Sequence, residues 1–403
     1  MPAIDEIKFL FRDRKDSFCY KPDKSLGPDN SKYVRAFHQS FNDYSPTPLI
    51  KMTNLSYELG LDSILVKDES YRFGQESCSV LGASYAIASI IAEKLNTDVR
   101  ELCLSKLRSD DILDKLGQKT FVTASRGNFG KAVAWFAHTI RQHSRVFFPK
   151  GTDEDSISTI TYPDADVEIT DDDFQNTFQY ALNYAALNNC ISVMDSSVAG
   201  NEMIPALLME GYLTIADEII EQLKYDKPSH VFVQAGSGCM AASVCAFFTS
   251  IYGNDRPVIS VVEPSKAGGI YCSVEASDNC VHEAKGNQHS IMAELCCQKP
   301  CSLAFEILNG YADCFICVPE WVAAKGMRIL GNPSGNDNRV LSGPSGAVTA
   351  GFLAEVMTNP SLNYYKEELK LDDTSKVLLI STEGITGCRY YRSIVWDGLF
   401  PSI

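Results

Sequence analysis

Four short segments of this 403-residue chain combine glycine with polar side chains beside apolar runs: residues 234–240, 123–130, 70–82 and 381–384. The first reads QAGSGCM and directly follows an apolar run. Glycines at such a turn let backbone N–H groups converge on an anion, and the N-terminus of the next helix adds partial positive charge. Residues 234–240 therefore predict an anion or phosphate loop, although a tight strand-to-helix turn without a ligand has the same spacing.

The apolar pattern around these segments predicts strands that alternate with helices. Short apolar runs predict buried strands at residues 63–67, 120–123, 145–148, 230–234, 258–262 and 376–380. Small and apolar residues over 80–95 and 130–139 predict helices. Such alternation is typical of an α/β fold with parallel sheets covered by helices on both faces. Ligands of these sheets bind beyond the carboxyl ends of the strands, so we expect the four segments to gather there.

Length and composition narrow the class of protein. The chain is too long for one ordinary core, which predicts two lobes, and 45% apolar residues can fill them. Lys and Arg number 36 against 51 Asp and Glu, and the resulting net charge of −15 repels nucleic acid and anionic lipid. No apolar run reaches about 18 residues, so we expect no membrane span.

Fourteen cysteines occur without a secretory signal, a combination that favours reduced thiols in a cytoplasmic protein. The one CxxC motif, residues 314–317, lies in an apolar run that predicts a strand. The six histidines are scattered along the chain. A metal site is therefore not expected.

Many ordered segments together point to one family. They are SPTPL at 45–49, VKDES at 66–70, RFG at 72–74, LT at 213–214, ADE at 216–218, VEP at 262–264, GMR at 326–328, LGNP at 330–333, SGAV at 345–348 and STEG at 381–384. Over nearly its whole length the chain resembles the diaminopropionate ammonia-lyases. These are fold-type II enzymes of the tryptophan-synthase β group that use pyridoxal phosphate (PLP).

The resemblance carries expectations about architecture. It implies an α/β fold of the fold-type II PLP class, with two lobes that each hold a mostly parallel sheet flanked by helices. The large lobe would comprise residues 1–80 and 198–403, and the small lobe residues 81–197. The resemblance also implies a homodimer.

The resemblance assigns roles to residues that this chain retains. The cofactor's phosphate would lie on a loop made of Gly236, Ser237, Gly238, Cys239 and Met240. Asn128 would lie beside the cofactor's 3-hydroxyl, and Asp195 corresponds to one of the family's two acidic bases.

Three positions depart from the family's pattern. The lysine that forms the Schiff base falls on Ser79, and no lysine occurs between Lys67 and Lys94. The second acidic base is Arg126, and a histidine nearby is Phe129. A serine hydroxyl cannot form an imine, and an arginine stays protonated near neutral pH. We therefore expect no covalent PLP, and PLP binding only without a covalent bond. We expect Lys67 to be part of an ion pair at a strand end and Lys131 to lie in a helix, so neither is an obvious substitute.

These departures leave three hypotheses of function. In the first, the chain is a PLP-independent enzyme that performs elimination, addition or cyclisation on a small anionic molecule derived from an amino acid. Asp195, Arg126 and Ser79 would then be its catalytic residues. In the second, it is a non-catalytic protein that binds a small molecule or a partner. In the third, it is a lyase that holds PLP non-covalently through residues 236–240 and Asn128. No histidine in the sequence is an obvious partner for Ser79, which favours a space-filling role over an activated hydroxyl.

Overall fold

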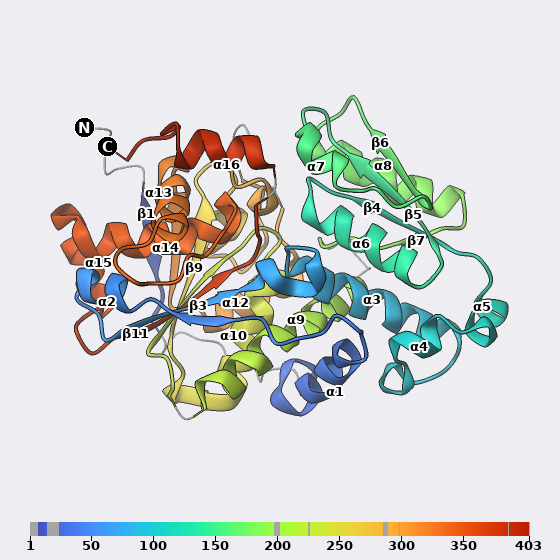
Figure 1. The fold of residues 1–403 in the computed structure, drawn as a ribbon, viewed down its shortest axis with the longest axis horizontal. Helices are drawn as coiled ribbons and strands as arrows, with labels where there is room; N and C mark the ends of the chain where they lie inside the picture. Colours follow the sequence, from blue (N-terminus) through green and yellow to red (C-terminus); the bar gives the residue numbers. More distant parts are fainter. Residues whose placement is uncertain are drawn as a thin grey trace.

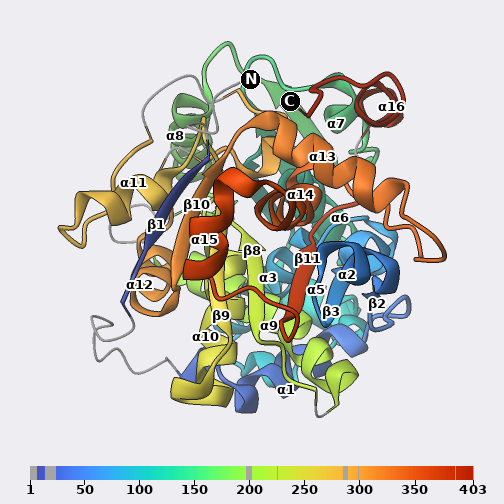
Figure 2. The same cartoon turned by 90° about the vertical axis from the view of Figure 1, so that its left-hand side faces the viewer.

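The computed structural model describes residues 7–13, 24–196, 202–224, 226–284, 289–297, 299–385 and 387–402. Within these ranges the larger of two sheets has seven strands in the order β1-β10-β9-β8-β11-β3-β2 (Figures 1 and 2). The strands are β1 (Lys8–Phe11), β2 (Leu49–Lys51), β3 (Ser63–Asp68), β8 (His230–Gln234), β9 (Val258–Pro264), β10 (Cys314–Val318) and β11 (Lys376–Ser381). The five inner strands are parallel, whereas β1 and β2 pair antiparallel at the two edges.

The smaller sheet has four strands in the order β6-β5-β4-β7, all parallel. They are β4 (Thr120–Ala124), β5 (His143–Phe148), β6 (Ala165–Ile169) and β7 (Ile191–Ser192). Figure 1 shows this sheet to the right of the larger one. The predicted α/β class with mostly parallel sheets is confirmed.

Helices of the described residues cover both sheets. With the larger sheet are α1 (Pro28–Gln39), α2 (Thr53–Leu59), α9 (Met203–Leu223), α10 (Cys239–Tyr252), α11 (Gly269–Ala276), α12 (Ser302–Tyr311), α13 (Glu320–Gly331), α14 (Pro344–Thr358), α15 (Asn363–Glu368) and α16 (Cys388–Val395). Along the chain around the smaller sheet are α3 (Ser79–Lys94), α4 (Leu104–Leu107), α5 (Asp110–Leu116), α6 (Asn128–Thr139), α7 (Glu154–Ser158) and α8 (Phe174–Leu187).

Strand β8 shows why its continuous apolar run forms a central strand. Its side chains alternate between the two faces of the sheet. Val231 and Val233 join the core beneath α9, α10 and α12, whereas Phe232 joins the core beneath α13 and α14. Both faces are buried, so no polar alternation appears in the sequence. The strands predicted at 63–67, 120–123, 145–148, 230–234, 258–262 and 376–380 are all confirmed.

Helices α13 and α14 cross at very short range because each has a glycine at the contact. A Cβ atom added to Gly326 would lie 2.0 Å from the carbonyl oxygen of Ala347. One added to Gly351 would lie 1.9 Å from the carbonyl oxygen of Val322. The backbones themselves are therefore in contact at this crossing.

A buried ion network fixes the segment that follows β3. The Lys67 ammonium donates to Glu218 at 2.7 Å, and the Arg72 guanidinium donates to both Glu69 and Glu218. All four side chains are fully buried. The predicted ion pair of Lys67 is confirmed, and the ammonium group of this lysine is occupied by Glu218 of α9. Lys131 lies in α6, as predicted, where its ammonium donates to the Gln75 carbonyl oxygen at 3.1 Å.

The end of the described chain is tied back onto the large sheet's helices. The Arg328 side chain in α13 donates to the carbonyl oxygens of Ile394, Leu399 and Phe400. Just before α16, Gly387 lies against Asp155 of α7, since an added Cβ would be 2.8 Å from the Asp155 carboxylate. Residues 387–400 thus reach from the large sheet to the small one.

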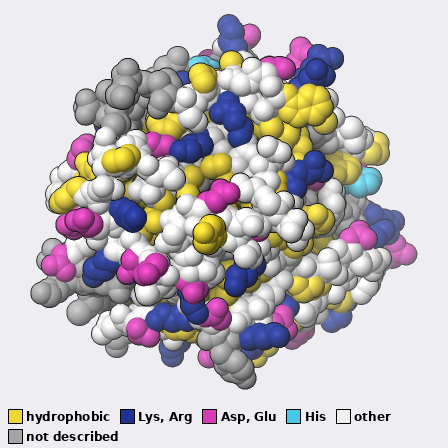
Figure 3. All heavy atoms as spheres, turned by 60° about the vertical axis from the view of Figure 1, so that its left-hand side comes forward, with side chains coloured by type: hydrophobic (Ala, Val, Ile, Leu, Met, Phe, Trp, Pro, Cys, Tyr) yellow, Lys and Arg dark blue, Asp and Glu magenta, His cyan; other side chains and the backbone are white. Residues whose placement is uncertain are grey.

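Acidic and basic side chains are interspersed on the face drawn in Figure 3, and hydrophobic side chains occur there in small groups. Among the described helices, none is long and apolar enough to span a bilayer.

Candidate active site

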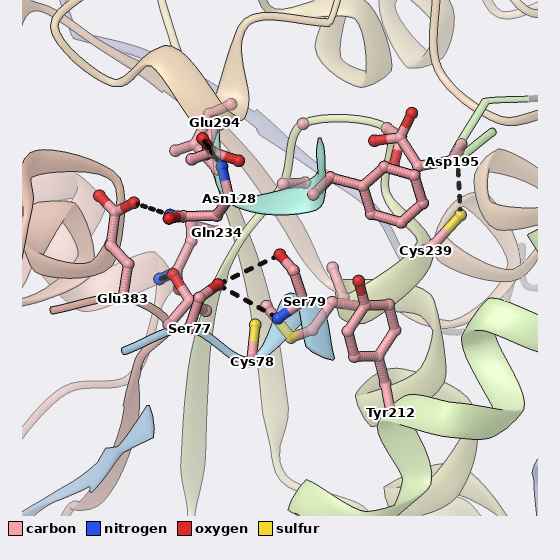
Figure 4. Close-up of a pocket in the computed structure, with 18 of the residues that line it drawn as sticks. Ser77, Cys78, Ser79, Asn128, Asp195, Tyr212, Gln234, Cys239, Glu294 and Glu383 are labelled. Atoms are coloured by element: carbon pink, nitrogen blue, oxygen red, sulfur yellow. Dashed lines mark hydrogen bonds between the residues drawn. The ribbon is translucent and has the colours of Figure 1, made fainter. Parts of the chain in front are cut away.

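A polar cavity of about 80 Å³ lies beyond the carboxyl ends of strands from both sheets (Figure 4). Its walls come from the segments after β4, β8 and β11, from the start of α3, from α9, and from residues 294–295. All four glycine-containing segments contribute to this cavity, as we expected. We call it the central cavity.

The predicted anion loop forms one wall of the central cavity. Gly236, Ser237, Gly238, Cys239 and Met240 all line it. Gly238 has φ +93°, a left-handed conformation that favours glycine, and α10 begins at the next residue. The Ser237 carbonyl oxygen accepts from the Cys301 N–H at 2.9 Å and is thereby occupied. The N-terminus of the 14-residue helix α10 therefore faces the cavity, which is the geometry an anion requires.

Ser79 is the first residue of α3 and also lines the central cavity. Its hydroxyl lies 3.2 Å from that of Ser77 and also hydrogen-bonds to the Tyr212 hydroxyl. Burial raises the pKa of Tyr212 well above its usual value. No lysine, arginine or histidine is among the described residues that line the central cavity. Lys67 and Lys131 are engaged elsewhere, so the wall at Ser79 has hydroxyl groups and no amine.

Asp195 lies beside the anion loop, shortly after β7. Its backbone carbonyl accepts from the Cys239 thiol at 3.2 Å. Burial of the carboxyl raises its pKa to about 6, and a hydrogen bond with the Ser237 side chain partly opposes that rise. A carboxyl with this pKa is mostly ionised at pH 7 and can accept a proton.

Asn128, the first residue of α6, joins two buried carboxyl groups that we did not predict as site residues. Its backbone N–H donates to Glu294 at 2.7 Å, and its side-chain amide donates to Glu383 at 2.8 Å. Glu383 also accepts from the Ser345 N–H at 2.9 Å. A side chain at Gly127 would displace the Glu294 carboxylate, because an added Cβ would lie 2.3 Å from one of its oxygens.

The environment of these two glutamates favours their neutral forms. Burial raises the pKa of Glu294 to about 8, and repulsion from Glu383 adds to that rise. Burial likewise raises the pKa of Glu383 to about 7, although hydrogen bonds from Ser345 and Asn128 oppose the rise. The central cavity therefore holds three carboxyl groups whose pKa values lie near neutrality.

Arg126 lies outside the central cavity, in two neighbouring pockets. A larger outer pocket of about 270 Å³ is lined by Arg126 together with Lys150, His289 and Tyr390. A smaller pocket of about 30 Å³ is lined by both Arg126 and Asp195. Glu294 lines all three spaces, so they adjoin one another. The structure thus brings Arg126 and Asp195 to one small pocket and Ser79 and Asp195 to another.

The Arg126 guanidinium is held by an aromatic ring and has a free donor. Its carbon lies 4.8 Å from the centre of the Phe174 ring. Its Nε atom is buried without a hydrogen-bond partner. Phe129, which the resemblance places where the family has a histidine, is buried and lines both the central cavity and the small pocket. Its ring contributes apolar surface to the two spaces that Asp195 also lines.

Sequence reasoning missed Glu294, Glu383 and Tyr212 as site residues. Glu383 lies in the STEG segment that drew attention for its glycine, and only its role was missed. Glu294 and Tyr212 carry no local motif, since they meet the cavity only through tertiary packing. Among the described residues, no group of three or more His, Cys, Asp or Glu side chains has an arrangement that could hold a metal ion.

Comparison with known proteins now adds a family to this geometry. Residues 41–362 match the family described as "Pyridoxal-phosphate dependent enzyme". The chain belongs to this family. It is 39% identical to the diaminopropionate ammonia-lyase of Escherichia coli K12 over 371 residues, which are 91% of this chain and 92% of the relative. It is 37% identical to the Salmonella typhimurium enzyme of that name over 397 residues, 97% and 98% of the two chains.

Solved structures agree with this assignment. The E. coli diaminopropionate ammonia-lyase in complex with D-serine has a TM-score of 0.90 and 36% identity, with 98% of this chain and 99% of that chain covered. The same enzyme with an aminoacrylate-PLP azomethine intermediate has a TM-score of 0.89 over 98% of each chain. Maize serine racemase, at 16% identity and a TM-score of 0.70 over 94% of this chain, shares the fold. The predicted fold-type II architecture is confirmed.

The family's cofactor fits one part of the cavity and not another. The anion loop at residues 236–240, with the α10 N-terminus behind it, suits a phosphate group. Elsewhere in the cavity wall, Ser79, Ser77 and Tyr212 offer hydroxyl groups where a covalent anchor needs an amine. The residues present thus fit a phosphate-bearing ligand that is held without a covalent bond.

Proposed function

We propose that this protein is a lyase-like enzyme that works without a Schiff-base lysine, by acid–base chemistry on a small anionic molecule derived from an amino acid. One observation carries the proposal. The central cavity keeps an intact anion loop and a buried carboxylate at Asp195, while the described residues that line it include no amine. Relatives that are named for diaminopropionate, at 37–39% identity, support the amino-acid character of the substrate.

Each residue has a role that follows from its position. Asp195 is the base: its carboxylate accepts a proton from the substrate carbon next to the carboxylate group. Arg126, with a free Nε donor, stabilises the negative charge that develops on that carboxylate. The anion loop holds a second negative group or a phosphate. Ser79 and Tyr212 fill the wall and orient the substrate through their hydroxyl groups. PLP, when bound in this fold, supplies an electron sink for such carbanions.

The first test asks whether any lysine binds PLP covalently. Purified protein is mixed with PLP, and its absorbance is recorded from about 300 to 500 nm, the range in which PLP aldehydes and imines absorb. Borohydride reduction followed by mass spectrometry then detects any trapped adduct. We expect no adduct on any lysine. A stoichiometric adduct on a lysine would contradict the proposal.

The second test measures proton abstraction. The protein is incubated in D₂O with 2,3-diaminopropionate or serine, and proton NMR follows loss of the α-proton signal. We expect exchange by the wild type and a loss of about 100-fold or more in Asp195→Asn, because general bases contribute about 10²–10⁴-fold. Glu263→Gln is the matched control, since Glu263 is a buried carboxyl outside the cavity. Equal exchange by Asp195→Asn and wild type would exclude Asp195 as the base.

Arg126 has a matched control in the same sheet region. Arg145 also stacks on an aromatic ring, that of Tyr184 at 4.7 Å, but it pairs with Glu168 away from the cavity. We expect Arg126→Gln to lower kcat/KM for exchange by about tenfold or more, as for loss of a charged hydrogen bond. Arg145→Gln should leave kcat/KM unchanged.

The intact anion loop favours a second candidate, a lyase that holds PLP non-covalently. In that case PLP added to the wild type raises the exchange rate, and dialysis removes the gain. A third result, binding of the small molecules without exchange in either condition, would instead indicate a non-catalytic binding protein. These outcomes separate the three hypotheses that the sequence left open.

A further inference from the structure

One end of the central cavity consists of hydrogen-bond acceptors that the proposed reaction does not use. Glu294 and Glu383 are joined there by Asn128, and Gln234 lies in the same wall (Figure 4). The three residues come from three distant segments: the residues before α12, the end of β11 and the end of β8. Both carboxyl groups are held firmly by backbone and amide donors, so their positions are fixed before a ligand arrives.

The side-chain oxygen of Gln234 lacks a hydrogen-bond donor. Its amide nitrogen donates to the carbonyl oxygen of Ile380 at 2.9 Å and to the Thr382 hydroxyl oxygen at 3.0 Å. Because a carbonyl oxygen can only accept, the amide orientation is fixed. The other end of the amide, Oε1, is then an acceptor, and it is buried without a hydrogen-bond partner in a residue that is 1% exposed. Buried acceptors of this kind are rare in proteins unless a ligand or water satisfies them.

The charged side chains around the cavity indicate that the group that donates to Gln234 carries a positive charge. No lysine, arginine or histidine is found among the described residues of the central cavity, although two glutamates are. The cations Arg126 and Lys150 line the adjoining outer pocket instead. The site is therefore dipolar: hydrogen-bond acceptors line the central cavity, and cations line the outer pocket. An ammonium group has three N–H donors and no acceptor, which matches three acceptor side chains.

We propose that Glu294, Glu383 and Gln234 form a binding site for an ammonium group, so that the amino-acid-derived substrate carries an ammonium group that enters the central cavity and a carboxylate that faces Arg126. This inference rests on the proposed function, since it names the class of substrate for the same site. It assigns to these three residues a role in recognition and leaves proton abstraction to Asp195.

Binding of an ammonium group at this site changes the protonation of Glu294 and Glu383. Without a ligand, burial raises the pKa of Glu294 to about 8 and that of Glu383 to about 7, so both carboxyl groups are partly protonated near pH 7. An ammonium ion stabilises their ionised forms. Binding of an amine that is itself fully protonated must then release protons from the protein into the buffer.

Calorimetry of the full-length protein with serine and glycerate tests the proposal. The two probes differ by an ammonium group in one and a hydroxyl group in the other. We expect serine to bind about ten- to hundredfold more tightly, the range for a charged hydrogen bond. Titrations near pH 7 in two buffers of different ionisation enthalpy should show proton release with serine and none with glycerate. Equal affinity for the two probes, no heat from serine, or serine binding without proton release would each overturn the proposal.

Variants localise the proton release. Glu294→Gln and Glu383→Gln should each reduce the protons released and weaken serine binding about tenfold, whereas glycerate binding stays unchanged. Glu263→Gln is the control, because Glu263 is equally buried and has a pKa raised by burial to about 8, but it accepts from the N–H groups of Ile270 and Tyr271 outside the cavity. Release that persists in both cavity variants would contradict the assignment. Serine binding with proton release but without α-proton exchange would leave the ammonium site standing while catalysis fails.

Discussion

At the scale of single residues, Asp195 differs from the other two carboxyl groups of the central cavity in the pKa of its side chain. Its pKa of about 6 is raised by burial, and the Ser237 hydrogen bond limits the rise. Glu294 and Glu383 have higher pKa values and are joined to each other through Asn128. Carboxyl groups held in different protonation states divide the tasks of base and recognition group between them.

The first prediction concerns the pH dependence of proton abstraction. Because the base acts only when ionised, the value of kcat for α-proton exchange at saturating substrate, where both glutamates already hold the ammonium group, should rise about tenfold per pH unit below about pH 6 and level off above it. Exchange rates measured by NMR from about pH 4.5 to 8 check this. A profile that is flat through pH 6 would mean that another group takes the proton.

The second prediction concerns the buried ion network. Burial alone would raise the pKa of Glu218, but Arg72 and Lys67 outweigh it and hold that pKa at about 2. Glu218→Gln removes the charge that both cations need, and we expect a loss of about 3–5 kcal/mol in the free energy of unfolding near pH 7. Urea unfolding followed by circular dichroism measures it.

The pH dependence of that loss has a definite sign. A carboxyl whose pKa is lowered in the folded state contributes stability above its unfolded pKa, near 4.5, and loses it as the pH falls toward 2. The difference between Glu218→Gln and wild type should therefore shrink below about pH 4.5. A difference that grows on acidification would contradict the ion-pair account.

At the scale of elements, the crossing of α13 and α14 allows a sharp test of packing. Gly351→Ala would place a methyl group 1.9 Å from the Val322 carbonyl oxygen, so the helices must separate. We expect a loss of about 3 kcal/mol or more, at the upper end for overpacking. Gly310→Ala in α12 is the control, because nothing lies within 4 Å of its added Cβ. There we expect no loss, or a gain of up to about 1 kcal/mol from helix propensity. Thermal unfolding of both variants decides between these outcomes.

The elements also show how far sequence reasoning reached. The strand at 230–234 was predictable because both of its faces are buried and its apolar run is continuous. Strand β1 was not, since KFLF lies in a charge-rich stretch and pairs as an antiparallel edge strand with residues some 300 positions away. Edge strand β6, ADVEI, was missed for a similar reason, because acidic residues interrupt its apolar pattern.

The residues of the site also divide into those that the sequence predicted and those that it did not. Residues 236–240 were predictable because their glycines form a local turn at a strand end, whereas Asn128 was assigned only through the resemblance to the family. Glu294 was not, because it reaches Asn128 across 166 positions of the chain and no local pattern marks it. Arg126 was predicted as a catalytic residue of one pocket, and its side chain instead lines the outer and the small pocket.

At the scale of the whole molecule, the cavity depends on both sheets at once. Asn128, Asp195 and Arg126 come from the segments around the smaller sheet, and the anion loop and Glu383 come from the larger one. The lobe limits at residues 80 and 198 stay a prediction. A change in the distance between the sheets would alter every pairing that we assign to the site.

The homodimer implied by the resemblance also stays a prediction, with a direct measurement. Sedimentation velocity at physiological salt should give a mass of twice the 44.4 kDa of one chain. A species of single-chain mass across the concentrations used for calorimetry would contradict it and would place the whole site within one chain.

The contacts of residues 387–400 also govern the order in which the site is made during synthesis. Tyr390 forms part of the outer pocket, and Arg328 secures the segment behind it. Every other wall is translated earlier, from Ser77 onward. A nascent chain can therefore complete the central cavity, whose wall ends with Glu383, before Tyr390 completes the outer pocket. The two spaces are thus completed in a fixed order during synthesis, with the carboxyl groups of the central cavity in place first.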